Sequence, residues 1–379
     1  MNVWHRFLLR SLVFYLNRKV RRRPPQPLAD LDLRRVRRLL LINSTAMGDL
    51  LLSTPAIRAL KETYPHWQLD LLVHPRNRDL VAHNPRISRL WLYPGRGVKL
   101  FRLMREIRRQ HYDAVLILHG NDPEASLVAW SAGTPFIVGS GRSPFAFAYA
   151  ARVSSQDSYR HAIERRLDLV RVLMADTNTR EMEVFLPSQE VYRAGDFLGR
   201  HFGDRPGVLM ALHPTGSGTY KWWPLERFAA LGHYLYQQYG AALLIISGSK
   251  DRQVAEALAA QLPGPNLVTG GRYPLLTVAG FLKHCRLLVA NDSGPMHLGL
   301  ALKVPTLALI GGDHPARIGP YQVKWGRALC KREEVCESEE CLKTRKCQNN
   351  RCMQAIDLQE VINTLKTWWE PRWWKGNRL

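Results

Sequence analysis

Three polar segments of this chain have residue types and spacings that suit an anionic ligand. The first, ANDSGPMHLGLAL at residues 290–302, lies between a short apolar run and apolar residues at helical spacing. This pattern predicts a buried strand, a tight turn and a helix. Gly294 would let a ligand approach the backbone, and the helix start would offer amides to an anion. An ordinary helix capped by Asn291, Asp292 or Ser293 fits the segment equally well when it is taken alone.

Two further segments follow apolar runs in the same way. Residues 208–212 precede HPTGSGTYKWWP, in which Gly216 and Gly218 make a flexible turn, Lys221 adds a cation and Pro224 opens a helix. Residues 242–246 precede SGSKD, a glycine turn with an aspartate just beyond it. Ligands of open parallel α/β sheets collect at the carboxyl ends of strands. Three such loops together predict a nucleotide site.

The first half of the chain contains one more strand-to-turn-to-helix pattern. Residues 39–42 predict a buried strand, and NSTAMGDLLLSTP follows, with Gly48 at the turn and Asp49 at its exit. From spacing alone, Asp49 is as well explained as a helix cap as by a catalytic role. Further strands are predicted at 69–73 and 114–118, with helical patterns between them. This alternation predicts a doubly wound α/β fold with parallel sheets.

These motifs resemble those of glycosyltransferase family 9, the ADP-heptose:lipopolysaccharide heptosyltransferases. The resemblance rests on TAMGDLLLSTPAIRALKETYP, HPTGSGTYKWWP, SGSKD and NDSGPMHLGLAL, in the family's order, and extends from about residue 39 to about residue 365. It implies a GT-B arrangement, in which two Rossmann-like domains face each other across a cleft. It also implies inverting transfer of heptose from ADP-heptose to a hydroxyl of the lipopolysaccharide inner core.

The resemblance also implies roles for individual residues. Asp49 matches the family's catalytic base, and Lys221 would stabilise the charge of the leaving diphosphate. Asp251 would bind the ribose and Asp292 would position the donor sugar. Thr215 stands where the family commonly has glycine, so the phosphate geometry there should differ. The residues expected to bind the nucleotide sugar are Thr215, Ser217, Lys221, Ser247, Gly248, Asp251, Asp292, Ser293, Gly294 and His297. The family requires no metal, and we expect no cofactor.

Two other functions remain compatible with these residues. A transferase could use a different nucleotide-sugar donor or acceptor, because a loop that holds a diphosphate does not specify the sugar. A nucleotide-sugar-binding subunit without transfer activity is the other alternative. The presence of both Asp49 and Lys221 favours an enzyme.

Length and charge set the expected organisation and partners. The chain has 379 residues, a formal net charge of +22 and an isoelectric point near 10.1, which together favour two domains and an anionic partner. No RNA-recognition, zinc-finger or basic-zipper signature is present, so we expect a membrane or glycolipid partner and no nucleic acid. The expected parts are a basic extension at 1–38, an acceptor-side domain at 39–190, a nucleotide-sugar domain at 191–352 and a C-terminal helix and tail at 353–379.

Residues 1–23 predict an amphipathic helix with a polybasic end. The apolar run is interrupted by Arg10 and is shorter than the roughly 20 residues that span a bilayer, and the charges follow the apolar core instead of preceding it. We therefore expect a cytoplasmic protein held peripherally on the inner face of the cytoplasmic membrane, with anionic lipid as the partner. A solvated basic extension is the alternative. Basic residues in the tract 139–166 could meet the acceptor or could be surface charge: Arg142, Arg152, Arg160, His161, Arg165 and Arg166.

Cysteines and tryptophans mark the end of the chain. Cys285 suits a buried core position, whereas the segment 330–352 carries five cysteines without close CxxC pairs. The segment suits a metal site, with Cys336, Cys341, Cys347 and Cys352 as ligands, or a pair of disulfides, which a reduced compartment disfavours. The resemblance implies that the last helix, 358–369, packs on the first domain. The ending TWWEPRWWKGNRL has the composition of a membrane interface. Packed core aromatics are the alternative, which Pro371 disfavours because it breaks the helix among the tryptophans.

Overall fold

The computed structural model describes residues 3–119, 123–203, 208–336, 347 and 349–374. The chain divides into two compact units, Met1–Arg180 and Glu181–Leu379. The expected domain boundary at 190/191 lies inside helix α8 (Ser188–Phe202), so residues 181–190 belong with the second unit. The N-terminal extension and the C-terminal tail are not separate parts either, because each belongs to one of the two units.

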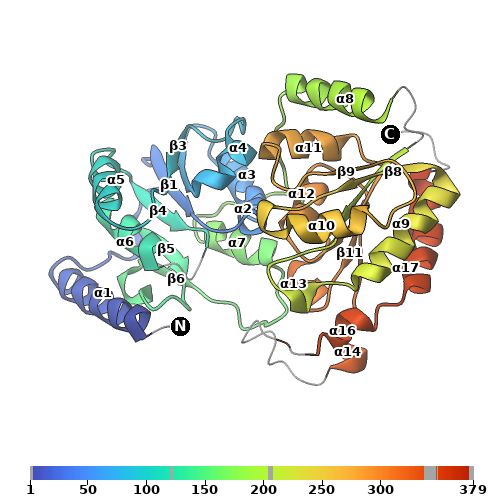
Figure 1. The fold of residues 1–379 in the computed structure, drawn as a ribbon. Coiled ribbons are helices and arrows are strands. Elements are labelled where there is room, and N and C mark those ends of the chain that lie inside the picture. The colour runs from blue at the N-terminus through green and yellow to red at the C-terminus, as the bar shows by residue number, and fades with distance from the viewer. Residues whose placement is uncertain (1–2, 120–122, 204–207, 337–346, 348, 375–379) are drawn as a thin grey trace. The chain divides into compact units, whose positions relative to one another are not determined.

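The first unit is built on a six-stranded sheet with the order β3-β2-β1-β4-β5-β6, and its strand pairs are all parallel. The strands are β1 (Arg38–Asn43), β2 (Gln68–Val73), β3 (Arg89–Leu92), β4 (Ala114–Ile117), β5 (Ile137–Ser140) and β6 (Ala151–Val153). The helices are α1 (Val3–Arg22), α2 (Met47–Leu51), α3 (Thr54–Thr63), α4 (Arg78–Val81), α5 (Val98–Arg108), α6 (Pro123–Ser131) and α7 (Ala162–Arg171). Figure 1 shows helices on both faces of this sheet.

The second unit repeats the plan, with the sheet order β12-β11-β10-β7-β8-β9 and parallel pairing throughout. Its strands are β7 (Val208–His213), β8 (Ala241–Ile245), β9 (Asn266–Val268), β10 (Leu287–Asn291), β11 (Thr306–Leu309) and β12 (Gly326–Leu329). After α8 come α9 (Leu225–Tyr239), α10 (Arg252–Ala259), α11 (Leu275–Lys283), α12 (Gly294–Ala301), α13 (Pro315–Ile318), α14 (Arg332–Val335), α16 (Arg351–Gln354) and α17 (Leu358–Thr364).

In both units the first strand lies beside the fourth, which is where the direction of winding reverses. The central strands β1, β7 and β10 are buried almost throughout, as expected for strands covered by helices on both faces. The predicted doubly wound α/β fold is therefore confirmed. The crevice at the carboxyl ends of β1 and β4, and that of β7 and β10, are the positions where such sheets bind ligands.

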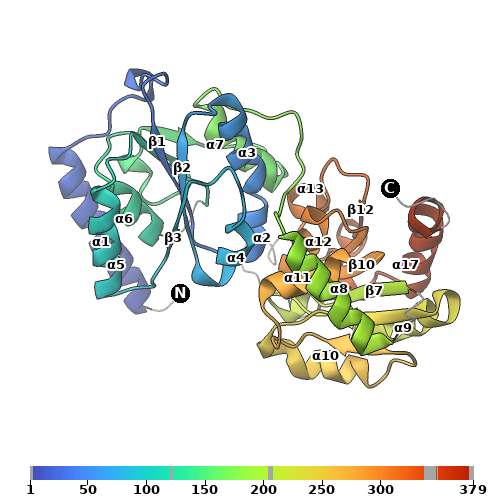
Figure 2. The ribbon, with the colours of Figure 1, turned by 90° about the horizontal axis from the view of Figure 1, so that it is seen from above.

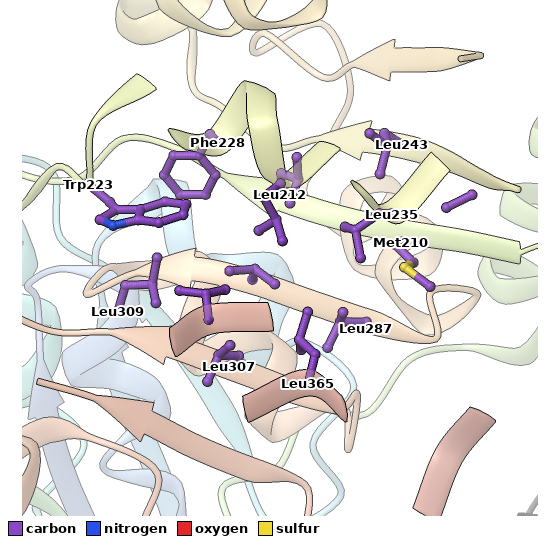
Figure 3. Close-up of a cluster of buried hydrophobic side chains, with 14 of the residues drawn as sticks. Met210, Leu212, Trp223, Phe228, Leu235, Leu243, Leu287, Leu307, Leu309 and Leu365 are labelled. Carbon is purple, nitrogen blue, oxygen red and sulfur yellow. The ribbon is translucent and has the colours of Figure 1, made fainter. Parts of the chain in front are cut away.

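The core of the second unit joins its sheet to helices on one face. Figure 3 shows side chains of β7, β8, β10 and β11 meeting Phe228 and Leu235 of α9 and Leu365 from the end of the chain. Leu365 opens a π-helical segment, Leu365–Trp374, that continues α17. Burial of these side chains is the main stabilisation of the unit.

The expectation of a membrane interface at the Trp-rich ending is wrong for Trp368 and Trp369, which are buried in the core of the second unit. Residues 358–374 belong to the second unit, and packing of the last helix on the first domain stays a prediction. Trp369 is fully buried, its indole N–H donates to the carbonyl oxygen of Arg286 at 2.9 Å, and its ring meets Tyr239 edge to face. Val361, Leu365 and Trp369 follow at helical spacing, so this tryptophan continues the apolar stripe of α17 into the core.

The N-terminal helix is also attached to its unit. α1 has 20 residues, and its Leu16 and Val20 lie in the same buried cluster as Ile107 and Tyr149. The helix is therefore a folded layer of the first unit, and the alternative of a solvated extension is wrong. Among the described residues, no helix is long and apolar enough to span a membrane.

Replacing Trp369 should test the role of the C-terminal segment. We expect Trp369→Ala to lower the free energy of unfolding by about 3–5 kcal/mol, since it removes a buried indole and its hydrogen bond. Tyr192→Ala, at a side chain that is 77% exposed in the same unit, should change it by less than about 0.5 kcal/mol. Urea unfolding followed by tryptophan fluorescence measures both. Equal effects would mean that the segment is only loosely attached.

Candidate functional site

The loop after β1 positions Asp49 through its backbone. The side-chain amide of Asn43, the last residue of β1, donates to the carbonyl oxygen of Asp49 at 3.0 Å and to the hydroxyl of Ser53 at 2.9 Å. Ser53 donates to the same carbonyl at 2.8 Å. The N-cap residue of α2 is Ala46, so the alternative that Asp49 serves as the helix cap is wrong. The buried amide network leaves the Asp49 side chain 32% exposed.

The carboxylate of Asp49 lies between two basic side chains from elsewhere in the first unit. Oδ1 accepts a hydrogen bond from the guanidinium of Arg166 at 2.7 Å, and Nδ1 of His119 lies 3.8 Å from the same oxygen. His119 follows β4, the neighbour of β1 at the reversal of the sheet. A cation this close favours the ionised carboxylate. Asp49 is therefore held charged and oriented at the ligand crevice of the first sheet.

Arg166 is a site residue whose place the sequence did not reveal. It lies on α7, where burial lowers the pKa of its guanidinium and the charge of Asp49 opposes that shift. An arginine keeps its charge even so, because its ordinary pKa is far above neutral. The sequence did contain a pattern that indicates this position. Arg166 recurs at helical spacing with three apolar residues, Ile163, Leu167 and Val170, which places it on the buried face of α7.

The rest of the basic tract divides between the interior and the surface. Arg160 makes ion pairs with Asp168, and His161 is buried as the N-cap residue of α7, where its ring accepts from the amide of Ile163. Arg142 and Arg152 are exposed. The alternative of scattered surface charge is therefore wrong for His161, and Arg160 is paired with a residue of α7; contact of this tract with the acceptor stays a prediction.

In the second unit, Asn291 links the loop after β10 to the loop after β7 by hydrogen bonds. This residue ends β10 and is fully buried. Its amide donates to the carbonyl oxygen of Pro214 at 2.7 Å, and its oxygen accepts from the amide of Trp223 at 3.2 Å. Both partners belong to the loop after β7, the neighbour of β10 in the sheet. The loops at the reversal of the second sheet therefore form one fixed surface.

Lys221 and Asp292 form an ion pair across these two loops. Their side chains are only 15% and 7% exposed. Burial lowers the pKa of Lys221, but the charge and hydrogen bond of Asp292 outweigh it, and the pKa lies above the ordinary lysine value. Lys221 is therefore protonated at neutral pH, with Asp292 as its counter-ion in this largely buried position. One carboxylate oxygen of Asp292, which we expect to position the donor sugar, is bonded to Lys221.

Two hydroxyls in this region lack hydrogen bonds. Thr215, after β7, is fully buried, and Ser247, after β8, is 7% exposed. Within the described part of the chain, neither Oγ atom has a hydrogen-bond partner. At the end of β7, Nδ1 of His213 lies 2.7 Å from the carbonyl oxygen of Ile246, and burial lowers the pKa of this imidazole while the charge of Asp251 opposes the shift. Buried polar atoms without partners are rare and indicate a place for a ligand.

The remaining predicted site residues lie at the same end of the sheet. Ser293 is the N-cap residue of α12, but its hydroxyl donates to the carbonyl oxygen of Asn291 at 2.9 Å and makes no capping bond. Gly294 begins α12, and His297 is buried one turn later. These residues and the earlier ones follow three neighbouring strands, β10, β7 and β8: Thr215, Ser217, Lys221, Ser247, Gly248, Asp251, Asp292, Ser293, Gly294 and His297.

The loop after β11 is a contributor that the motif analysis missed. A Cβ atom at Gly312 would lie 2.5 Å from the ring of Tyr220 and 2.9 Å from Cγ of Lys221, so only glycine lets the loop pack this closely. The charge of Asp313 also raises the pKa of Lys221. The sequence pattern that could have indicated this loop is the pair Gly311-Gly312 directly after an apolar run.

Two Rossmann-like units, each with polar loops at the reversal of its sheet, define a doubly wound α/β protein of the class that binds ligands at these loops. The profile of glycosyltransferase family 9 (heptosyltransferase) matches residues 100–348. The chain belongs to this family and is a glycosyltransferase. The matched range contains the loops of the second unit but not Asp49.

Individual relatives agree with this assignment. Lipopolysaccharide heptosyltransferase 1 of Pseudomonas aeruginosa is 28% identical over 305 residues, which cover 75% of this chain and 81% of that protein. A family 9 glycosyltransferase of Veillonella parvula has a TM-score of 0.76 at 23% identity and covers 88% of this chain and 97% of its own. An Escherichia coli heptosyltransferase, WaaC, solved with ADP-2-deoxy-2-fluoro heptose, has a TM-score of 0.62 at 19% identity and covers 87% and 99%. The last two similarities concern the fold.

Breaking the Lys221–Asp292 pair should cost stability in a specific way. We expect Lys221→Met to lower the free energy of unfolding by about 3–5 kcal/mol, because a nearly buried carboxylate loses its counter-ion. Adding Asp292→Asn should recover most of that loss, and urea unfolding of the two single variants and the double variant measures the coupling.

The same pair fixes a pH dependence. Because the folded pKa of Lys221 is raised, its stabilisation is complete below the ordinary lysine value of about 10.4 and is lost as the pH rises through the folded pKa. The difference between the parent and Lys221→Met should therefore stay constant from neutral pH to about pH 10. If the double variant Lys221→Met/Asp292→Asn were as unstable as Lys221→Met alone, the energetic coupling of the ion pair would be refuted.

Proposed function

We propose that this glycosyltransferase moves heptose from ADP-heptose to a hydroxyl of the lipopolysaccharide inner core, with inversion at the anomeric carbon. The observation that carries the proposal is the nearly buried Lys221, in the loop after β7, together with the buried hydroxyls of Thr215 and Ser247 after the neighbouring strands β7 and β8, which lack hydrogen-bond partners among the described residues. A diphosphate needs such a cation and such donors. The names of the relatives, and the ADP-heptose analogue bound to the Escherichia coli protein, support the choice of donor and acceptor class.

In the proposed reaction the acceptor hydroxyl attacks the anomeric carbon of the heptose. A new carbon–oxygen bond forms while the bond from that carbon to the diphosphate breaks, and the electron pair leaves with ADP. Asp49 takes the hydroxyl proton as general base. Arg166 holds its carboxylate ionised before the reaction, with Oδ1 fixed by a 2.7 Å hydrogen bond.

The second unit would stabilise the leaving group. Negative charge grows on the diphosphate as its bond breaks, and Lys221 is already in place because Asp292 fixes it. Amides at the start of α12, near Ser293 and Gly294, would add donors, since the Ser293 hydroxyl does not cap them. Because these groups supply the charge stabilisation, we propose that transfer needs no catalytic metal.

The other residues receive roles from their positions. Thr215, Ser217, Ser247 and Gly248 would contact the phosphates, and Asp251 would accept hydrogen bonds from the ribose hydroxyls. Asp292 would reach the sugar with the oxygen that does not bind Lys221, and His297 would line the same site. We further propose that the enzyme works peripherally on the inner face of the cytoplasmic membrane, where an amphiphilic acceptor would be held.

Asp49→Asn tests the base. We expect transfer to slow by roughly 10²–10⁴, because an amide cannot take the proton. ADP binding should stay close to the parental value, since the donor residues belong to the other unit. Radiolabelled sugar transfer to truncated core glycolipids measures the rate, and calorimetry measures ADP binding. Because Arg166 loses its counter-ion, circular dichroism at the assay temperature must confirm that the variant is folded.

Lys221→Ala serves as the matched comparison for that test. It should weaken ADP binding as well as turnover, because the diphosphate charge is present before the transition state and grows in it. Parental transfer by Asp49→Asn would remove Asp49 from the chemistry. ADP binding by the parent without transfer to any core glycolipid would instead favour a silent nucleotide-sugar-binding subunit, and transfer from another nucleotide sugar would revise the donor.

The cysteine segment allows a separate test for metal. Cys352 is buried and Cys336 and Cys347 are half-buried, whereas Cys341 lies outside the described residues. The described part contains no group of three metal-ligand side chains. We expect less than one equivalent of zinc or iron by elemental analysis of protein purified under reducing conditions. A full equivalent, lost together with fold stability in Cys352→Ser, would make the segment a metal site.

A further inference from the structure

The first unit contains a groove that the transfer reaction does not use. It has a volume of about 570 Å³, within the range of ligand pockets, and lies between α1, the end of α5 and the segment 130–137. Figure 2 shows α1 beside α5 and α6. Much of its lining is apolar and comes from each of these elements, including Val20, Phe101, Met104, Trp130 and Ile137. A groove of this composition suits a hydrocarbon chain.

Cations surround this apolar lining. Five basic side chains line the groove and no aspartate or glutamate does: Lys19, Arg22, Arg23, Arg105 and Arg108. The four arginines are exposed, and none of the five makes an ion pair within the described parts of the chain. Helix surfaces usually balance such charges, as Arg102 and Glu106 do on the outer side of α5. The unbalanced rim therefore selects a negatively charged ligand.

A second, more polar groove of about 370 Å³ adjoins the first. Arg23 and Arg108 line both grooves, and His111, Tyr112 and Asp113 line only the second. The carboxylate of Asp113 is already bonded to the amides of residues 37 and 38, at 2.7 and 2.8 Å. The order along the surface is thus apolar groove, two arginines, polar groove. This order matches the acyl chain, phosphate and headgroup of a lipid.

The mouth of the apolar groove suits a membrane surface. Phe101 lines it and is 70% exposed, and nearby Val98 and Phe14 are 85% and 71% exposed on α5 and α1. Exposed aromatic and aliphatic side chains beside basic ones are typical of helices that bind at the interface of anionic bilayers. Soluble surfaces rarely leave such side chains together.

We propose that this groove binds one anionic glycerophospholipid, with an acyl chain along Met104 and Ile137 and its phosphate between Arg23 and Arg108. Residues 130–136 precede β5 and residues 108–113 precede β4, so the site lies at the amino ends of these strands. Asp49 follows the carboxyl end of β1, at the opposite end of the same sheet. The lipid is therefore a membrane anchor and is not the sugar acceptor. This inference extends the membrane part of the proposed function.

Calorimetry with monomeric dihexanoyl phosphatidylglycerol, below its critical micelle concentration, tests the site on the full chain. We expect saturable binding of one equivalent, and binding roughly 10- to 30-fold weaker for Arg105→Gln/Arg108→Gln, at about 1 kcal/mol for each cation. The matched control is Lys99→Gln/Arg109→Gln, which removes the same charge from α5 and its C-cap residue, at positions outside the groove, and should change the affinity less than about twofold.

Three further measurements decide whether the site is specific for a charged amphiphile. Met104→Trp should block binding by filling the groove, while circular dichroism and thermal unfolding confirm the fold. Dihexanoyl phosphatidylcholine and deacylated glycerophosphoglycerol should each bind at least tenfold more weakly than the anionic lipid. Equal losses in the two double variants, equal binding of the neutral lipid, or equal binding of the deacylated headgroup would each overturn the proposal. None of these measurements depends on sugar transfer, so failure here leaves the reaction proposal standing.

Discussion

The parallel pairing of β7 with β10 is the constraint on which the donor side of this protein depends. These strands are distant in the sequence, and their adjacency places the loops after them at one end of the sheet. Asn291 then joins the loops by two buried hydrogen bonds. Only with both loops fixed can Lys221 and Asp292 meet in a position that is almost dry, where an ion pair is stable because each partner is satisfied. The position of the Lys221 ammonium group therefore depends on the strand order of the sheet, because neither loop alone would fix it.

The first unit also fixes a charged side chain at the reversal of its sheet, but with other groups. It has no lysine at the reversal of its sheet but a carboxylate, which Arg166 fixes from α7. The backbone of the same residue is held by Asn43 and Ser53. Backbone and side chain are thus positioned by independent groups. This redundancy reduces the conformational freedom of Asp49, which is what a catalytic group requires.

Much of this arrangement could be predicted from the sequence, for a physical reason. Strands buried on both faces are continuous apolar runs, and turns that bind phosphate need glycine and a cation, so β1, β7, β8 and β10 and their loops leave strong local patterns. Arg166, Gly312 and the packing of Trp369 were not predicted, because they depend on which distant element each side chain meets. The Trp-rich composition of the C-terminal end was misleading, because it indicates amphipathic character without saying which face is covered.

The burial of Leu16 and Val20 gives α1 a mechanical meaning. A helix joined to its domain by a flexible linker would let the domain rotate freely above whatever the helix touches. Here Leu16 and Val20 pack α1 into the same core as α5 and the sheet, so the helix and the domain move together. Whatever surface α1 rests on also sets the tilt of β1, and with it the direction from which a second molecule can approach the end of that strand. The contact of α1 with a surface and the orientation of the end of β1 are therefore set together, and neither can change without the other.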